Sequence, residues 1–498
     1  MSDKLNRLKE IIGEVSDLGR ASSVLGWDQQ VNMPPMGAEA RGQQLATLGK
    51  IAQEKFTSDE MGKLLEDLQK EYQDAETDDG AMIRVTARNY DKAKRVPSSF
   101  VAEQAVAASK AFEAWVEAKK KSDFKIFLPF LEKNVELVKK YVSFFPPADH
   151  PYDVLLDDYE PGMKTSEVQE IFGNLRPKQV ELIKAISEAK QVKDKFLHKK
   201  YNEEKLWKFS EKIISKFGYD FNRGRQDKAP HPFETTFSVN DVRITNRYET
   251  ENPMATLFSA MHECGHALYE LGVNPAYERT SLESGTSLAI HESQSRMWEN
   301  MVGRSLPFWE HFYPDLKKTF SSQLEDVKLK QFYKAINKVQ PSLIRVNADE
   351  ATYNLHIMLR LEIEIGMVDG SIRIKDLPEI WNTKFKEYLG ITPPNDAQGV
   401  LQDIHWSYGS IGYFSTYALG NIVSAQLWEK IRKDIKNLDD LTRKGKFEKL
   451  REWLRVNIHQ YGHKYDPQDI VQKVTGSRID SAAYVRYLMK KFSEIYDL

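Results

Sequence analysis

The feature that most constrains this chain is a hydrophobic spacing of three and four residues that recurs along most of its length. Residues 2–20 show the spacing plainly, because their leucines, isoleucines and valine fall on one face of a 3.6-residue helix. The polar faces interleave glutamate with lysine, as solvated helix surfaces do. The pattern therefore predicts a mainly α-helical protein. Further helices are expected over 101–145, 166–190, 203–217, 323–338, 424–436 and 477–496.

One region breaks this spacing. In residues 231–250, apolar and β-branched residues alternate on either side of Val239-Asn240-Asp241, which favours a short hairpin with a tight turn. Asn252-Pro253 then resembles an N-cap followed by a proline in the first helical position, and Gly272 offers a stop. A small antiparallel β element is therefore expected beside a helix over 253–271. Loops with glycine or proline are expected near 271–287, 305–314 and 390–400.

Composition narrows the classes of partner. The 498 residues include 71 Lys+Arg and 73 Asp+Glu, so the net charge of −2 gives no bulk attraction to nucleic acid or to an anionic membrane. The sequence has no apolar run of the roughly 20 residues that a membrane helix needs. The charged first 20 residues lack the apolar core of a signal peptide, and the single cysteine, Cys264, fits a reducing compartment. We expect a cytoplasmic protein with neither nucleic acid nor membrane as a partner.

The segment His262-Glu263-Cys264-Gly265-His266 carries the chemistry. Residues i and i+4 of a helix share one face, so both imidazoles can reach a single ion, and zinc prefers such nitrogen ligands. Glu263 lies about 100° round the helix and can act on water without binding the ion itself. A chance match in a charged helix is the alternative, but Gly265 inside a helix costs about 1 kcal/mol relative to alanine, which indicates a close approach there. Cys264 faces elsewhere and is expected to be buried rather than a ligand.

A third protein ligand is needed, and the sequence offers several carboxylates. A third histidine of the extended zinc pattern would fall at Gly272, so that class is excluded. Glu270 is one turn beyond His266, too far along the axis for the same ion. Glu292, which opens an amphipathic segment 26 residues after His266, is the favoured candidate, because a second helix packed on the first can present it. Glu278 and Glu283 lie in an expected loop.

Three further residues have unusual neighbours. His231 begins the predicted hairpin, and His405 lies in a Gln-Asp-Ile-His-Trp segment that is followed by Tyr413. Hydrolysis of an amide develops an oxyanion, and imidazolium or phenol groups can donate to it, so these side chains are candidates for the site. Arg345 is flanked by mostly apolar residues and is expected to be partly buried as a fork for a carboxylate, either of a protein aspartate or of a substrate C-terminus.

Taken together, these segments resemble one family, the M32 metallocarboxypeptidases. The resemblance covers nearly the whole chain, including Trp27-Asp28 and Met33-Pro34 near its start, and six motifs occur in the family's order. One departure lies near Asn457-Ile458-His459, where the family usually continues His-Gly and this chain reads Gln-Tyr-Gly; it bears on local structure more than on chemistry. The six motifs are His231–Phe233, Asp241-x-Arg243-x-Thr245, His262–His266, His291–Arg296, Ile344–Asp349 and Gly399–Trp406.

The resemblance implies a fold and an activity. It implies one catalytic domain over 1–498, with two lobes flanking a deep cleft, similar in outline to angiotensin-converting-enzyme-like peptidases. It implies a homodimer that uses zinc, or cobalt, to remove single residues from the free C-termini of peptides, a carboxypeptidase of the EC 3.4.17 type. The implied specificity is broad, with poor handling of proline, glycine or acidic residues at the C-terminus.

The family's roles carry over to matching positions of this sequence. The metal ligands would be His262, His266 and Glu292, with Glu263 as general base. His231 would touch the substrate backbone, and Arg345 would hold the C-terminal carboxylate. The tetrahedral intermediate would be stabilised by His405 and Tyr413.

Two other functions compete with this prediction. An oligoendopeptidase of related fold would share the metal core but cleave peptides internally. A non-enzymatic helical binding protein with a decayed site would lack catalytic parts, and the sequence retains all of those named above.

Overall fold

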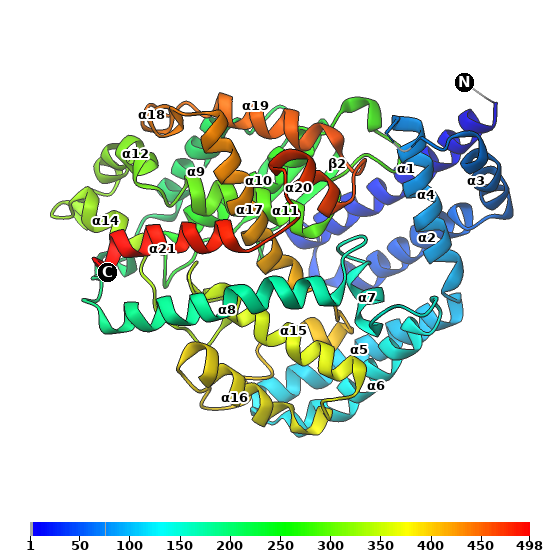
Figure 1. Ribbon diagram of the computed structural model, residues 1–498, viewed down its shortest axis with the longest axis horizontal. Coiled ribbons are helices and arrows are strands. Elements are labelled where there is room, and N and C mark those ends of the chain that lie inside the picture. Colours follow the sequence, from blue (N-terminus) through cyan, green and yellow to red (C-terminus); the bar gives the residue numbers. More distant parts are fainter. Residues whose placement is uncertain (1–2, 75) are drawn as a thin grey trace. The chain divides into compact units, whose positions relative to one another are not determined.

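The computed structural model describes residues 3–74 and 76–498, and it confirms a mainly helical protein with one small sheet (Figure 1). The chain forms two compact units. Unit 1 comprises Met1–Lys94, Lys193–Ile336 and Leu427–Gly476, and unit 2 comprises Arg95–Val192, Asn337–Gln426 and Ser477–Leu498. Each unit is therefore assembled from segments that are distant in sequence. The predicted cleft between two lobes of a single domain stays a prediction.

Unit 1 holds the sheet and most of the helices. Its α-helices and strands are α1 (Asp3–Val31), α2 (Ala38–Phe56), α3 (Asp59–Glu71), α4 (Asp78–Arg95, whose last residue belongs to unit 2), α9 (Glu203–Phe217), β1 (Gln226–Lys228), β2 (Glu234–Ser238), β3 (Asp241–Asn246), α10 (Ala255–Leu271), α11 (Leu288–Arg296), α12 (Leu306–Thr319), α13 (Ser321–Leu324), α14 (Leu329–Ile336), α18 (Leu438–Arg443), α19 (Glu448–Asn457) and α20 (Pro467–Thr475). Short 3-10 turns lie at Pro35–Gly37, Lys195–His198, Pro275–Tyr277 and His459–Tyr461, and a π-helical segment η4 (Met297–Val302) follows α11.

The regular elements of unit 2 are all helices, with no strand among its described residues. Its α-helices are α5 (Ser98–Lys121), α6 (Phe124–Val142), α7 (Pro151–Leu156), α8 (Thr165–Glu188), α15 (Tyr353–Asp369), α16 (Leu377–Leu389) and α21 (Ala482–Tyr496), and α17 (Ser415–Asp434) runs from unit 2 into unit 1. The 3-10 turns lie at Arg345–Asn347, Ile374–Asp376 and His405–Tyr408.

The core of unit 1 begins at the predicted N-terminal helix. Leu5, Leu8 and Ile11 of α1 are buried against Met61 and Leu65 of α3, as the three- and four-residue spacing requires. The helix continues to Val31, beyond the predicted end at residue 20, although most of its later residues are partly or fully exposed.

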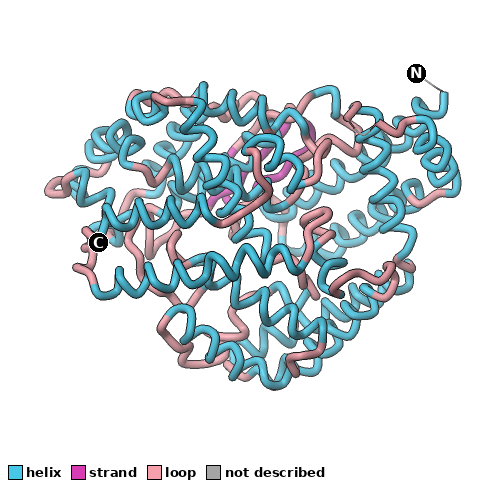
Figure 2. The backbone as a smooth tube through the Cα atoms, viewed as in Figure 1, coloured by secondary structure: helices cyan, strands magenta, loops and turns pink. Residues whose placement is uncertain are grey.

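The predicted hairpin is present, but the sheet is larger than expected. Strands β2 and β3 pair antiparallel, with an irregularity between Thr236 and Ser238. A third strand, β1, pairs parallel to β3, giving the order β1-β3-β2, and Figure 2 draws the three strands in magenta. Sequence reasoning missed β1 because its three residues are polar and too few to show an alternating pattern.

The helix that carries the zinc motif also begins later than predicted. It starts at Ala255, not at Pro253, because Asn252 and Pro253 form turns whose carbonyls accept from the amides of Ala255 and Thr256. Its end at Gly272 is confirmed.

Three helix boundaries are corrected as well. The stretch 101–145 is two helices, since Ser122 has a left-handed φ of 53° and Asp123 caps α6. The stretch 305–314, predicted as a loop, lies in α12, where Ser305 caps the helix and Pro307 sits in its first turn. The stretch 323–338 is broken between α13 and α14, so it is not one helix.

Candidate metal centre

The metal centre is built by α10 and α11, which lie side by side in unit 1 (Figure 1). Gly265 explains how closely they approach. A Cβ atom at this position would lie 2.6 Å from Ser295 Cα and 2.7 Å from the Gln294 carbonyl oxygen. The predicted close approach at Gly265 is therefore the backbone of α11, and it brings α11 within reach of the histidines on α10.

Three donor atoms converge at this contact. Glu292 Oε2 lies 3.5 Å from His262 Nε2 and 3.4 Å from His266 Nε2. All three ligand atoms lie within 4.8 Å of one another, and among the described residues they form the one cluster of three such donors with this spacing. Two nitrogens and one oxygen at these separations fit a single divalent ion. The predicted set of His262, His266 and Glu292 is thus brought together.

His262 has a direct carboxylate partner on its outer nitrogen. Its Nδ1 lies 3.0 Å from Glu299 Oε2, and Arg296 contacts the carboxylates of both Glu292 and Glu299, at 2.6 and 3.3 Å. Burial works against ionisation, but Arg296 and the two histidines hold the pKa of Glu292 well below its usual range. Glu292 is therefore a carboxylate, as a metal ligand must be.

His266 is supported through a second histidine. Its Nδ1 lies 2.5 Å from His291 Nδ1, and His291 Nε2 lies 2.9 Å from Glu270 Oε1. Burial lowers the pKa of His266 to about 3, so the imidazole is neutral near neutral pH and keeps a lone pair for an ion. Glu270 thus takes part in this site without being one of the three converging ligands.

Glu263 and Cys264 lie on α10 between the two histidines. Burial, aided by the nearby carboxylates Glu292, Glu234 and Glu299, raises the pKa of Glu263 to about 7, while His262 lowers it. A carboxyl group with such a pKa can take and return a proton near neutral pH. Cys264 is fully buried, and burial raises the pKa of its thiol, which confirms the expected role as a packing residue.

The remaining predicted residue of unit 1 is His231. It lies just before β2 and is exposed, with its Nδ1 2.7 Å from the carbonyl oxygen of Pro232. The following Phe233 is tied to β3, because its amide donates to Thr245 Oγ1 at 2.9 Å. The motif around His231 is thereby fixed to the sheet, while its role with a substrate stays a prediction.

Arg345 lies in unit 2 and is buried, as expected. Its Nε and Nη2 donate to Asp403 Oδ1 at 3.0 and 2.8 Å, and its Nη1 donates to Tyr353 Oη at 3.0 Å. Arg360 donates to the other oxygen of Asp403 at 2.7 and 2.5 Å. Of the two carboxylates considered for Arg345, the structure shows the protein aspartate. Burial opposes ionisation, but the two guanidinium groups hold the pKa of Asp403 far below its usual range.

His405 and Tyr413 occupy one loop of unit 2, and their rings lie 5.4 Å apart. Glu364 of α15 holds this segment through two hydrogen bonds. It accepts from Trp406 Nε1 at 2.8 Å and from the Gly412 amide at 3.0 Å. The hydroxyl of Tyr152 donates to the same carboxylate at 2.6 Å. A single buried carboxylate therefore holds both ends of the segment that carries the two predicted oxyanion donors.

Sequence reasoning missed several residues of this arrangement. Glu299 could have been found, since it lies seven residues after Glu292 and so on the same helix face. The contact of His291 with His266 depends on how α10 and α11 pack, and no spacing encodes it. The departure near His459 also lies closer to the site than expected, because His459 Nε2 is 3.0 Å from Gln294 Oε1 on α11.

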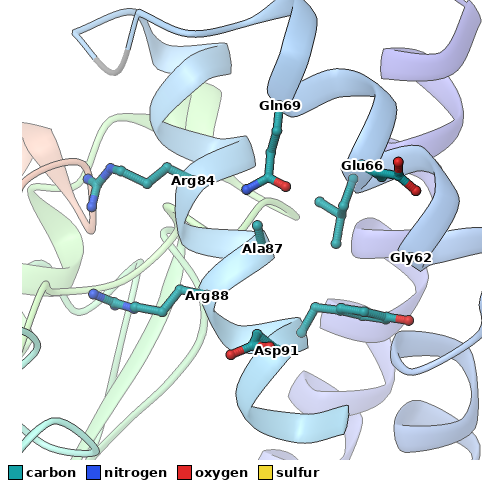
Figure 3. A pocket seen from close by; sticks show the side chains of 9 residues that line it. Gly62, Glu66, Gln69, Arg84, Ala87, Arg88 and Asp91 are labelled. Atoms are coloured by element: carbon teal, nitrogen blue, oxygen red, sulfur yellow. The ribbon is translucent and has the colours of Figure 1, made fainter. Parts of the chain in front are cut away.

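A separate surface pocket of about 480 Å³ lies between α3 and α4 (Figure 3). Its two arginines, Arg84 and Arg88, turn to one side and bind Asp466 Oδ1 at 3.1 and 3.2 Å. The lining contains none of the metal-centre residues. The cations of this pocket are thus paired within the protein, and the chemistry lies at α10 and α11.

Comparison with known proteins agrees with this geometry. A family model described as Carboxypeptidase Taq (M32) metallopeptidase matches residues 7–492. Carboxypeptidase 1 of Bacillus subtilis is 37% identical over 488 residues, covering 98% of this chain and 97% of that protein. Thermostable carboxypeptidase 1 of Thermus thermophilus is 38% identical over 501 residues, covering 98% of each. The crystal structure of an M32 carboxypeptidase from Deinococcus radiodurans R1 superposes with a TM-score of 0.97 at 36% identity, covering 100% of both chains.

The fold and the histidine–glutamate centre define a helical metallopeptidase. The chain belongs to the M32 metallopeptidase family, and the predicted class, a metal-dependent carboxypeptidase, is confirmed. The oligoendopeptidase alternative is not favoured, because the matching relatives over the length of the chain are named carboxypeptidases.

Proposed function

We propose that this protein is a zinc-dependent carboxypeptidase, of the EC 3.4.17 type, that releases single residues of broad identity from free peptide C-termini. The observation that carries the proposal is the convergence of two imidazole nitrogens and one carboxylate oxygen beside a buried glutamate. Two nitrogens and an oxygen favour zinc over the harder magnesium and calcium, and cobalt suits the same donors. When bound, the ion would supply a Lewis acid that acidifies water and polarises a carbonyl oxygen.

The chain's own residues supply the proton transfers. Glu263 would accept a proton from the attacking water and pass it to the leaving amine, and a pKa of about 7 suits both directions. His262, His266 and Glu292 would hold the ion, with Glu299 and Arg296 fixing their orientation. His405 and Tyr413 are proposed to stabilise the developing oxyanion, and His231 to contact the substrate backbone, on the resemblance alone.

Arg345 is proposed to hold the substrate's C-terminal carboxylate. A guanidinium carries five N–H donors, and the bonds to Asp403 and Tyr353 use three of them. One hydrogen remains on each terminal nitrogen and can be donated to a further acceptor such as a carboxylate. Asp403 would then fix the plane of the guanidinium while its outer edge receives the substrate.

Peptides with matched ends test the activity. Mass spectrometry should show a ladder of products that shorten by one residue from a free C-terminus, and no products from the same peptide with an amidated C-terminus. A chelator should stop the reaction, and added zinc or cobalt should restore it. Internal cleavage, or equal cleavage of the amidated peptide, would reject a carboxypeptidase.

Arg345→Ala tests the carboxylate contact. We expect a large loss of kcat/KM on free C-termini with unchanged metal content. An unaltered kcat/KM would remove Arg345 from substrate binding while leaving the metal chemistry in place.

Two further predictions rest on the resemblance. We propose a homodimer, which light scattering of the purified protein would detect, and a cytoplasmic location, which cell fractionation would test. Among the described residues, the helices include none that is long and apolar enough to cross a membrane.

A further inference from the structure

The two histidine ligands are held by different kinds of partner. His262 meets the carboxylate of Glu299 directly, whereas His266 meets another imidazole, His291, which in turn meets Glu270. We propose that His291 and Glu270 are positioning residues that set the tautomer and the ring orientation of His266. This inference rests on the proposed function, because it requires His266 to bind the metal.

The tautomer of His266 follows from where the ring hydrogens of His266 and His291 can lie. For His266 Nε2 to offer a lone pair at the converging point, the ring hydrogen must sit on Nδ1. That nitrogen lies 2.5 Å from His291 Nδ1, so His291 must accept there, and its own hydrogen must sit on Nε2. His291 Nε2 then donates to Glu270 Oε1 at 2.9 Å. Each contact of the chain therefore holds one hydrogen, and the carboxylate at its end selects the tautomer that leaves His266 Nε2 open.

The hydrogen-bonded chain from His266 through His291 to Glu270, called the relay below, can orient His266 only if His291 is itself fixed by packing. The ring of His291 lies 5.1 Å from the ring of Tyr269. Gly285 lies close to both of these rings, because a Cβ atom at this position would lie 2.6 Å from Tyr269 and 3.0 Å from His291 Cδ2. The amide of Gly285 also donates to Glu270 Oε1 at 3.1 Å. The glycine is thus close enough to orient the carboxylate without displacing the imidazole.

Glu270, at the end of the relay, is buried, and within the described residues only one of its two carboxylate oxygens is hydrogen-bonded. Its side chain is buried, and its outer oxygen, Oε2, has no hydrogen-bond partner within residues 3–74 and 76–498. The hydrogen bonds of this carboxylate go to His291 and Gly285. A buried carboxylate with one oxygen left unbonded is unfavourable for stability, which argues that its position serves the relay.

Three variants separate the parts of the relay. His291→Phe keeps a ring of similar shape but removes both nitrogens. His291→Asn keeps an acceptor oxygen near the position of Nδ1, so it can still receive the hydrogen of His266. Glu270→Gln keeps an acceptor oxygen and removes the charge. His356→Phe is the matched control, because His356 is a fully buried histidine of α15 in unit 2 and is not one of the converging ligands.

The test measures the dissociation constant of Zn²⁺ for each purified variant by competition with a chromophoric chelator, together with the absorption spectrum of the Co²⁺ form. We expect His291→Phe to weaken Zn²⁺ binding by about 10–100-fold, the range found for partners that orient a metal-bound histidine. His291→Asn should recover most of the affinity, Glu270→Gln should lose less than His291→Phe, and His356→Phe should bind as the wild type does.

The inference would be overturned if folded His291→Phe bound Zn²⁺ as tightly as the wild type, or if His291→Asn lost as much affinity as His291→Phe. Equal loss in His356→Phe would also overturn it, since the effect would then be general to buried histidines. Should His291→Phe fail to fold, Glu270→Gln alone decides, and unchanged affinity in that variant rejects the relay. A wild-type protein that binds no metal defeats the proposed function, whereas an active wild type with an unaffected His291→Phe defeats this inference alone.

Discussion

Each unit holds a buried charged cluster, and the two clusters differ in how their charges are satisfied. In unit 1 the Oε2 atom of Glu292 lies 3.5 and 3.4 Å from the Nε2 atoms of two imidazoles, so that three possible ligand atoms gather at one point. In unit 2 the two oxygens of Asp403 are each bound by an arginine, so the cluster satisfies its own charges. In the first arrangement Arg296 pairs with one oxygen of Glu292 and the three converging atoms can still share a cation, whereas the second is complete within the protein.

This contrast shows how a binding site can be recognised among buried charges. Burial and shifted pKa values occur in both clusters and do not distinguish them. The distinguishing feature is the kind of group that gathers: three atoms able to bind one ion lie together in the metal centre, whereas both oxygens of Asp403 are bound by the cations Arg345 and Arg360.

The largest effect is expected at the base of the metal centre. Glu263→Gln should lower kcat by about 10²–10⁴-fold, because the variant cannot accept the proton of the attacking water. Metal content, measured by atomic emission, should stay at the wild-type level, since Glu263 is not one of the converging ligands. Substantial residual hydrolysis would reject Glu263 as the base, and loss of the metal would mean that it also holds the ion.

The next effect tests the cluster around Asp403, whose charges are paired within the protein. Asp403→Asn leaves Arg345 and Arg360 buried without a counter-charge, and we expect a loss of about 3–5 kcal/mol in the free energy of unfolding, measured by urea titration. Asp376→Asn is the control, because its pair with Arg373 is exposed and should change stability by less than about 1 kcal/mol. Equal effects of the two substitutions would remove the distinction between the clusters.

The packing beneath the metal centre is tested by a glycine. Gly265→Ala forces its methyl group against the backbone of α11 and should destabilise the protein by about 1–3 kcal/mol, with weaker Zn²⁺ binding. Gly173→Ala in α8 is the matched control, because nothing lies within 4 Å of the added Cβ atom and alanine favours helix. A Gly265→Ala protein with wild-type stability and affinity would show that the helices need no close approach.

The loop of unit 2 is tested at Glu364. Glu364→Gln leaves one of its buried donors facing an amide NH₂, which should cost about 1–3 kcal/mol and lower kcat through the loop that carries His405 and Tyr413. The dissociation constant of Zn²⁺ should not change. A drop in metal affinity would show that the two clusters are coupled, and an unchanged kcat would separate this loop from catalysis.

The most gradual effect is the pH dependence that Glu364 gives to stability. Burial raises the pKa of Glu364 to about 7, so between pH 4.5 and 7 the folded protein binds more protons than the unfolded chain. Its contribution is complete below pH 4.5 and is lost as the pH rises through 7, with a slope no steeper than about 1.4 kcal/mol per pH unit. Urea titrations across this range should show a shallower decline in Glu364→Gln, and an identical slope would contradict the raised pKa.

Much of the metal centre could be predicted because it is local. The four-residue separation of His262 and His266 places both rings on one helix face in any context. Glu292 could be predicted as a ligand because a zinc site with two histidines needs a third group, and a helix is expected around it. The glycine between the histidines also indicated the close contact that the structure shows at Ser295.

Helix ends were less predictable, since caps and tertiary packing decide them. The spacing over 203–217 is strictly amphipathic and ends at a left-handed glycine, and α9 has the predicted bounds. At 305–314 two prolines suggested a loop, but Ser305 and Pro307 start a helix and Pro314 is accommodated inside it. Strand β1 forms because β3 offers it a hydrogen-bonding edge, which no local pattern in Gln226–Lys228 records.

Sequence alone was enough to predict the helical fold class and the family, which are confirmed, and to propose two histidine ligands with a neighbouring base. The tertiary structure alone decided the partners of these groups. His291 reaches His266 across 25 residues and Arg345 reaches Asp403 across 58, contacts that exist because separate helices and loops pack together. Helical periodicity and ligand spacing are properties of a few consecutive residues, whereas the orientation of a buried charge depends on every element packed around it.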